Sequence, residues 1–154
     1  MKLFLRLTCA VIVIAFLQSC RKEIVAPPPP QNPVIGSWIL TDAAQSNGYG
    51  WQPFITGFEN SVFSFYANGS AQYDDGHLVL TGNWNMQTVT DGYYDEYGNY
   101  YTNTHQAFQV HAADAYSNSS IDVYFDDISF IDNNHFIATY YDGTYIDRYN
   151  FSRY

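Results

Sequence analysis

The sequence has few cysteines and few positive charges, and both cysteines and four of the six lysines and arginines lie in its first 22 residues. No cysteine follows Cys20 and no lysine follows Lys22 in a chain of 154 residues. The remainder cannot form a disulfide framework, so its stability must come from a hydrophobic core. Beyond residue 33, two arginines stand against fourteen carboxylates, which gives a net charge of −12. Such a surface repels phosphate backbones and excludes nucleic acid as a partner.

The sequence motifs and spacings that commonly support catalysis are not found beyond residue 33. Without a lysine beyond residue 22 the domain has no Schiff-base nucleophile, and no Gly-x-Ser-x-Gly motif occurs. His105 and His111 would share one strand face but stand about 20 Å apart at ~3.3 Å per residue. His77 and His135 adjoin turn sequences. These spacings predict no zinc site, no cofactor and no enzyme activity.

One acidic cluster is a candidate for a different metal. Asp91, Asp95 and Glu96 lie among glycines in a stretch without a strand pattern, as a flexible oxygen cage for calcium would. Their spacing does not match the EF-hand loop. The pairs Asp74-Asp75 and Asp126-Asp127 fit a turn and a β-bulge instead. We assign no metal ligand from the sequence, and calcium at the first cluster stays an alternative.

The N-terminus has the composition of a secretory signal. Two basic residues among the first six precede an apolar run over residues 7–17, which is too short to span a bilayer. The run ends in Leu17-Gln18-Ser19-Cys20, which resembles the lipobox of bacterial lipoproteins. The resemblance implies that residues 1–19 are a lipoprotein signal peptide and that Cys20 carries the lipid. An ordinary secretory signal that happens to contain a cysteine is the alternative.

The segment after Cys20 fits a membrane-anchored protein. Residues 20–33 include four consecutive prolines, which favour a polyproline II spacer of about 3.1 Å per residue. Stable membrane anchoring requires more than one acyl chain, and several acyl chains on one cysteine would meet this requirement. The sequence therefore predicts a protein of the cell envelope, lipid-anchored to the bacterial outer membrane and facing the periplasm or the surface. The folded domain would comprise residues 34–154.

From Val34 onward, apolar residues alternate as in β-strands and helical periodicity is missing. Asn68-Gly69 and Asp75-Gly76 are typical of tight hairpin turns. The pattern predicts eight strands over residues 34–41, 60–67, 70–74, 77–87, 102–113, 120–131 (with a bulge at Asp126-Asp127), 135–141 and 144–153. Antiparallel strands in this order predict an all-β up-and-down barrel, since closure removes exposed edges. A two-sheet β-sandwich is the alternative.

Short motifs along this domain resemble one known family. Gly36-Ser37-Trp38 in the first predicted strand resembles the Gly-x-Trp signature of lipocalins. The later segments Phe65–Gly69, Thr81–Trp84 and Tyr149–Arg153, in that order, are similar to the lipocalin-like (calycin-type) domains of bacterial lipoproteins. The likeness extends over residues 34–154.

The resemblance assigns structural roles to three residues. It implies that Trp38 closes the floor of the barrel and that Gly36 lets the strand bend beside it. It also implies that Arg153 on the last strand packs over the tryptophan ring, with Arg148 as the second choice. A stacked guanidinium would contribute on the order of 0.5–2 kcal/mol. These residues would hold the fold together and would not perform chemistry.

The aromatic content underlies two functional hypotheses. The domain has 27 aromatic residues against 17 leucines, isoleucines and valines. An eight-stranded barrel can be filled by side chains or can hold one small ligand. The first hypothesis is a lipocalin-like binding protein for a small apolar molecule in the barrel. The alternative is a filled barrel that contacts glycan or protein through a hairpin at residues 91–101, with candidate binding residues Tyr93, Tyr94, Tyr97, Tyr100 and Tyr101.

The anchor is tested by replacing the proposed acceptor, Cys20→Ser. We expect loss of metabolic palmitate labelling and of membrane association after cell fractionation, because the thiol is the group that receives the lipid. Thr8→Ser, a similarly mild change inside the signal, serves as the control and should label normally. Continued labelling of the Cys20→Ser protein would contradict the lipobox assignment.

Overall fold

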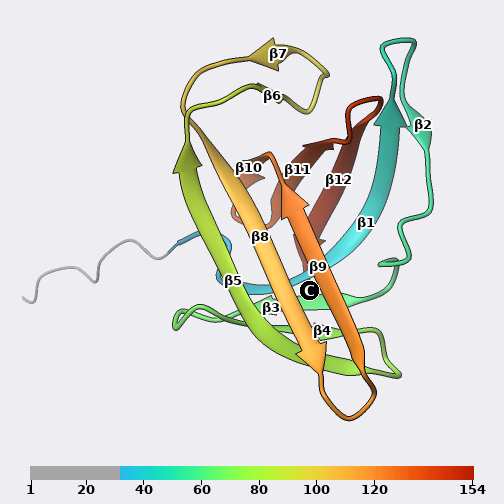
Figure 1. The fold of residues 1–154 in the computed structure, drawn as a ribbon, viewed down its shortest axis with the longest axis vertical. Helices are drawn as coiled ribbons and strands as arrows, with labels where there is room; N and C mark the ends of the chain where they lie inside the picture. The colour runs from blue at the N-terminus through green and yellow to red at the C-terminus, as the bar shows by residue number, and fades with distance from the viewer. Residues whose placement is uncertain (1–31) are drawn as a thin grey trace, which may run out of the picture. The chain divides into compact units, whose positions relative to one another are not determined.

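The computed structural model describes residues 32–154, which form twelve strands and no helix. The predicted signal peptide, Cys20 and most of the spacer lie outside these residues. The strands in chain order (Figure 1) are β1 (Gly36–Ser46), β2 (Gln52–Pro53), β3 (Val62–Phe65), β4 (Ser70–Asp74), β5 (Val79–Val89), β6 (Tyr93–Tyr94), β7 (Tyr100–Tyr101), β8 (His105–Asp114), β9 (Ser119–Phe125), β10 (Asp127–Asp132), β11 (His135–Tyr141) and β12 (Ile146–Arg153).

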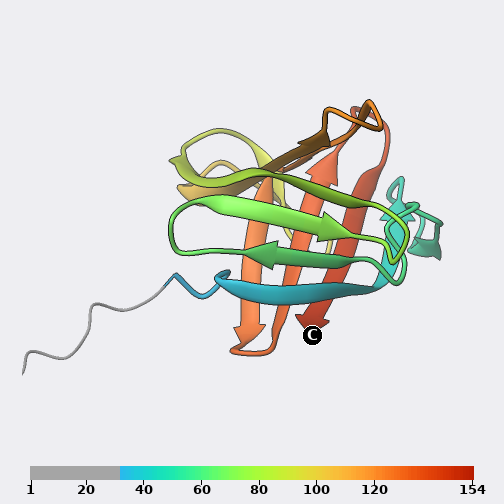
Figure 2. The same ribbon diagram turned by 90° about the horizontal axis from the view of Figure 1, so that it is seen from below.

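Nine of these strands follow one another in a single antiparallel sheet. The hydrogen-bonded order is β10-β11-β12-β1-β3-β4-β5-β8-β9, β2 pairs with β1, and β6 and β7 form a separate hairpin. Seen from below, β3, β4 and β5 cross in front of β10, β11 and β12 (Figure 2), so the sheet curves back over itself. The predicted all-β class and antiparallel pairing are confirmed, as are the Asn68-Gly69 hairpin between β3 and β4 and the Asp75-Gly76 turn that follows.

The segment predicted as one bulged strand, residues 120–131, is two strands. Asp126 separates β9, which pairs with β8, from β10, which pairs with β11. The amide of Asp126 donates to the Thr139 carbonyl at 2.8 Å, and its carboxylate accepts the Tyr141 amide at 2.7 Å. Since β9 and β10 do not pair with each other, no closed hydrogen-bonded barrel is found between residues 32 and 154. The prediction of one bulged strand over residues 120–131 was wrong because a bulge and a strand break shift the alternation of hydrophobic residues in the same way.

The first strand is longer than the sequence pattern predicted. β1 continues through Ser46, with a register irregularity between Leu40 and Asp42. This irregularity shifts the buried positions from Trp38 and Leu40 to Ala43 and Ala44. The polar Thr41-Asp42 pair therefore resembled the start of a loop, although it is a bulge within the strand.

Aromatic rings fill the inner side of the curved sheet. Trp38, Phe108 and Phe136 are almost completely buried. Phe136 lies edge-on to Trp38, with ring centroids 4.6 Å apart, and stacks on Phe151, also at 4.6 Å. On the other wall Phe65 meets Phe108 edge-on at 5.1 Å. The inner space is thus occupied by side chains, one of the two states available to a small curved sheet.

Arg153, Trp38 and Gly36 meet at one end of this core. The Arg153 guanidinium carbon lies 4.1 Å from the centre of the Trp38 ring, which is the arrangement that the resemblance implied. Its three nitrogens donate to the carbonyls of Ile35 at 2.6 Å, Pro33 at 3.0 Å and Asn133 at 3.1 Å. The guanidinium therefore links the start of β1 to the β10–β11 turn and to its own strand, β12.

Gly36 makes room for this contact. Its φ is +132°, and an added Cβ would stand 1.8 Å from Arg153 Nη1. Trp38 is held from the other side, because its indole nitrogen donates to the Val34 carbonyl at 2.7 Å. A side chain at position 36 would therefore displace the arginine from the tryptophan.

Gly36→Ala should destabilise the protein by roughly 2–4 kcal/mol, since backbone strain and loss of the arginine contacts act together. Urea unfolding of the full-length protein measures the change. Gly76→Ala is the matched control, because Gly76 also has a positive φ, +83°, but an added Cβ meets nothing within 4 Å. The control should lose only about 1 kcal/mol. Equal losses would show that the Arg153 contact adds nothing to stability.

Candidate functional site

The tyrosine-rich hairpin predicted at residues 91–101 is present as β6–β7, and it is folded against the sheet. Tyr93 stacks on His105 of β8, with ring centroids 4.1 Å apart. The Tyr94 carbonyl accepts the Thr139 hydroxyl at 2.7 Å, and the Glu96 carbonyl accepts Arg148 Nη1 at 3.1 Å. These contacts hold the hairpin to β8, β11 and β12.

The five candidate tyrosines are therefore not equivalent. Tyr93 and Tyr94 are half-buried, whereas Tyr97, Tyr100 and Tyr101 are exposed by 74%, 59% and 42%. Tyr93 and Tyr101 stack at 5.8 Å, and Tyr94 and Tyr100 lie 5.2 Å apart. Only the last three tyrosines offer free area to a partner.

Two of the three candidate acidic residues already have partners within the described part of the chain, Asp95 in the turn of the hairpin and Asp91 in His105 of β8. Burial raises the pKa of Asp95, but hydrogen bonds from the Asn99 side chain and from nearby backbone amides outweigh it and hold the pKa below its usual value. Asp91 lies 3.2 Å from His105 Nε2. Within residues 32–154, no group of three or more histidine, cysteine, aspartate or glutamate side chains is placed to hold a metal ion.

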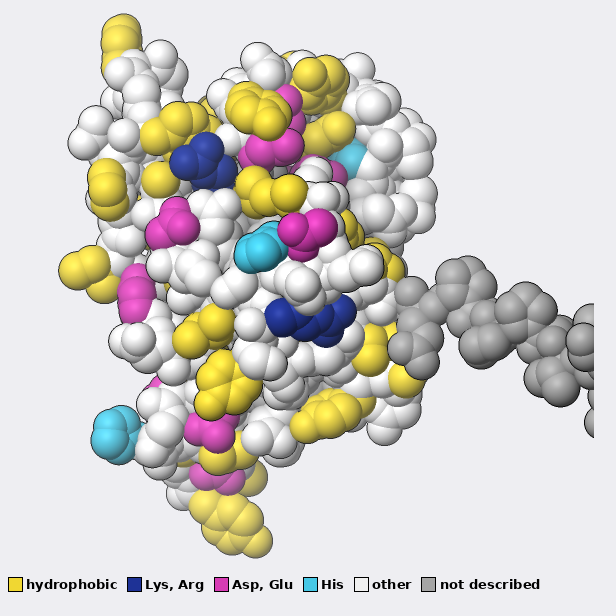
Figure 3. Space-filling model, turned by 180° about the vertical axis from the view of Figure 1, so that it is seen from behind, with side chains coloured by type: hydrophobic (Ala, Val, Ile, Leu, Met, Phe, Trp, Pro, Cys, Tyr) yellow, Lys and Arg dark blue, Asp and Glu magenta, His cyan; other side chains and the backbone are white. Residues whose placement is uncertain are grey.

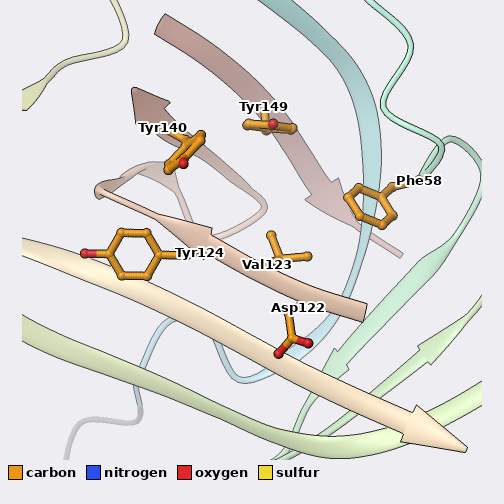
Figure 4. Close-up of a pocket in the computed structure, with 6 residues that line it drawn as sticks. All are labelled: Phe58, Asp122, Val123, Tyr124, Tyr140 and Tyr149. Carbon is orange, nitrogen blue, oxygen red and sulfur yellow. The ribbon is translucent and has the colours of Figure 1, made fainter. Parts of the chain in front are cut away.

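A pocket of about 340 Å³ lies between β9 and the β11–β12 pair (Figure 4). Val123 and Tyr124 belong to β9, Tyr140 to β11 and Tyr149 to β12. Phe58 reaches it from the segment before β3, and Asp122 completes the lining. Four of the six lining residues are thus aromatic.

The pocket occurs where the sheet ends. β9 pairs with β8 along one edge, and no strand among residues 32–154 pairs with its other edge. Val123 lies opposite the buried Val110, which places it on the inner face, and Tyr149 alternates with the buried Phe151. The pocket therefore opens from the free edge of β9 onto the inner face, and the Tyr149 ring forms part of its floor, 5.1 Å from Phe125.

Two carboxylates lie at or next to this pocket: Asp122 belongs to its lining, and Asp147 does not line it but contacts the lining residue Tyr149. The Tyr149 hydroxyl donates to Asp147 Oδ2 at 3.4 Å. Burial, and secondly the Asp147 carboxylate, raise the pKa of Tyr149 far above its ordinary value. Burial also raises the pKa of Asp147, with a further contribution from Asp142. Asp147 Oδ1 is buried and has no hydrogen-bond partner within residues 32–154.

Positive charge lies elsewhere in the described part of the chain. The Arg148 guanidinium lies over the Trp51 ring at 4.3 Å, and Arg153 lies over Trp38. Figure 3 shows the two arginines as separate dark blue patches with acidic and hydrophobic side chains between them. Asp122 at the pocket rim is paired with His111 Nδ1 at 2.6 Å, so it is partly neutralised when that histidine is protonated. Neither arginine lines the pocket.

Sequence reasoning did not find this site. Tyr140, Tyr149 and Phe58 were counted among the aromatic residues but not assigned to a site, and Asp147 was not singled out. One signal was present: Asp147, Tyr149 and Phe151 alternate in the last strand, which places a carboxylate on the same face as core rings.

Comparisons with known proteins give no family assignment. No protein-family model matches the chain, and neither a curated protein nor a solved structure matches it. Among residues 32–154, no helix has the length and apolar character needed to cross a membrane.

Proposed function

We propose that this protein is a non-enzymatic, lipid-anchored binding protein that takes a small molecule with an apolar body in the pocket between β9 and the β11–β12 pair. The observation that carries this proposal is the pocket itself, about 340 Å³ with four aromatic rings in its lining. This volume is within the range of small-molecule sites, roughly 300–1,000 Å³. The tyrosine hydroxyls at its rim add groups that can orient a ligand.

The hypothesis from the sequence placed the ligand inside the barrel, whereas this proposal places it at the free edge of β9. A ligand in the centre would have to displace Phe136, Phe151 and Trp38, which pack against one another. Such displacement would cost several kcal/mol of core packing. The pocket at the β9 edge is already open, and a ligand there would cover Val123 and the Tyr149 ring without disturbing the core.

We also propose a lipocalin-like barrel whose last seam is made by side chains instead of hydrogen bonds. The two ends of the strand order support it, since β10 lies beside β8 and β11 lies beside β9. The contact of Trp38 with Arg153 supports it as well. In this arrangement the lipid on Cys20 would tether the barrel to the outer membrane, the proline-rich spacer would separate it from the membrane surface, and the barrel could retain a ligand in the envelope.

The pocket is tested by filling it. Val123→Trp, at the edge of the pocket, should abolish binding of small aromatic alcohols and amines to the full-length protein, measured by ligand-observed NMR with a protein-free blank. Val79→Trp on β5 is the matched control, because Val79 is 48% exposed and lines no described pocket. The control should bind as the unmodified protein does. The proposal is wrong if no probe in the panel binds saturably, or if binding persists in Val123→Trp.

The exposed hairpin tyrosines support a second candidate function, contact with a glycan or a protein. Tyr97, Tyr100 and Tyr101 are exposed on one short hairpin, and each offers a rigid ring with a polar tip. A double change, Tyr97→Ser with Tyr100→Ser, should then lower binding on a glycan array or to envelope proteins by at least tenfold. Tyr116→Ser is the control, since Tyr116 is fully exposed outside the hairpin. Equal binding by both variants would remove this candidate.

A further inference from the structure

We propose that the pocket between β9 and the β11–β12 pair selects organic cations, namely small molecules that carry a quaternary or protonated amine on an apolar body. This inference rests on the proposed function and names the ligand class for the same site. Three features of the described residues support it: ring faces around the pocket, a carboxylate without a counter-charge beside it, and no positively charged side chain in its lining.

The aromatic walls are the first feature. Figure 4 shows Val123 pointing from β9 toward Tyr149, with Tyr140 and Phe58 on either side. Tyr124 lies farther along β9 and lines the same pocket. A cation within about 6 Å of such rings is attracted by their quadrupoles, by about 0.5–1 kcal/mol at exposed sites and about 2 when desolvated. Methyl groups on the nitrogen would at the same time cover apolar ring surface.

The carboxylate is the second feature. Asp147 pairs with Tyr140 across β11 and β12, and Tyr149 follows two residues later, so the three side chains share one face of the ladder. Asp147 Oδ2 accepts the Tyr149 hydroxyl, while Oδ1 is buried without a partner within residues 32–154. A partly desolvated carboxylate is costly unless a positive charge compensates it. Asp147 does not itself line the pocket, so it would act on a cation held against the Tyr149 ring through the field of its charge and not by direct contact.

The distribution of charge is the third feature. The only cationic side chains with a fixed charge beyond residue 33 are Arg148 and Arg153. Both are engaged with tryptophan rings and do not line the pocket. The domain as a whole carries a net charge of −12, so its field attracts cations and repels anionic ligands such as fatty acids. A neutral apolar ligand would gain from the rings but not from Asp147.

A matched pair of probes isolates the charge. (4-Hydroxymethylphenyl)trimethylammonium and 4-tert-butylbenzyl alcohol have nearly the same shape and differ in having a charged nitrogen or a neutral carbon. Isothermal titration calorimetry on the full-length protein at neutral pH and low salt should give a dissociation constant at least tenfold lower for the cation. The preference should fall in high salt, because part of it is electrostatic.

Asp147→Asn keeps the shape of the side chain and removes its charge, so it should reduce the preference for the cation by at least fivefold while leaving the affinity for the alcohol unchanged. Asp132→Asn makes the same change of charge at the β10–β11 turn, at the opposite end of β11 from Tyr140, and should keep the preference. Tyr140→Leu retains apolar area but removes a ring face, so it should lower the affinity for the cation more than the affinity for the alcohol. Melting temperatures confirm that each variant is folded.

The outcomes separate this inference from the proposed function. If the alcohol binds as tightly as the cation and Val123→Trp blocks both, the pocket binds ligands but does not select cations, and the inference is overturned alone. If neither probe binds and no other probe of the NMR panel does, both proposals are overturned. If the cation is preferred equally in Asp147→Asn and Asp132→Asn, the general charge of the domain is responsible and the assigned role of Asp147 is wrong.

Discussion

The contact between Arg153 and Trp38 is the point on which the rest of the fold depends. It joins the last strand of the chain to the first, and both strands occupy the middle of the sheet order. The same guanidinium donates to carbonyls before β1 and in the β10–β11 turn. One side chain therefore adds contacts to the start of β1 and to the β10–β11 turn beyond the backbone pairing of β1 with β12, and a side chain at Gly36 would occupy the space of the arginine.

This anchoring at one end explains why an opening can exist at the other side. The strands next to Arg153 are held by stacking, by hydrogen bonds and by the aromatic core, whereas β9 has a hydrogen-bonded neighbour on one edge only among the described residues. At Asp126 the hydrogen-bonded partner of the chain changes from β8, which pairs with β9, to β11, which pairs with β10. The aromatic pocket lies between β9, which pairs with β8, and the β11–β12 pair. Its lining comes from three strands and one loop, so it exists only in the folded chain.

Much of this architecture could be predicted from local sequence, and the pocket could not. Alternation and tight turns such as Asn68-Gly69 identify strands because they depend on neighbouring residues alone. The position of Arg153 over Trp38 followed from a resemblance in motif order. The break at Asp126 produces the same phase shift as a bulge, and the docking of the tyrosine hairpin depends on its contacts with Thr139 and Arg148. Residues 58, 123 and 149 meet only through the curvature of the sheet, which has no local signature.

Among residues 32–154 one edge of β9 has no paired strand, and this has a consequence for self-association. A bare strand edge is a template on which a second chain can add a strand, and this is a common route to self-association. Asp122 and Tyr124, which line the rim of the pocket, are exposed side chains of β9. A charged side chain in an edge strand opposes pairing with an identical neighbour, since like charges would stand side by side. Lipid anchoring would confine many copies to two dimensions and raise their encounter rate. The charge of Asp122 would then oppose the edge-to-edge pairing of neighbouring molecules into a continuous sheet.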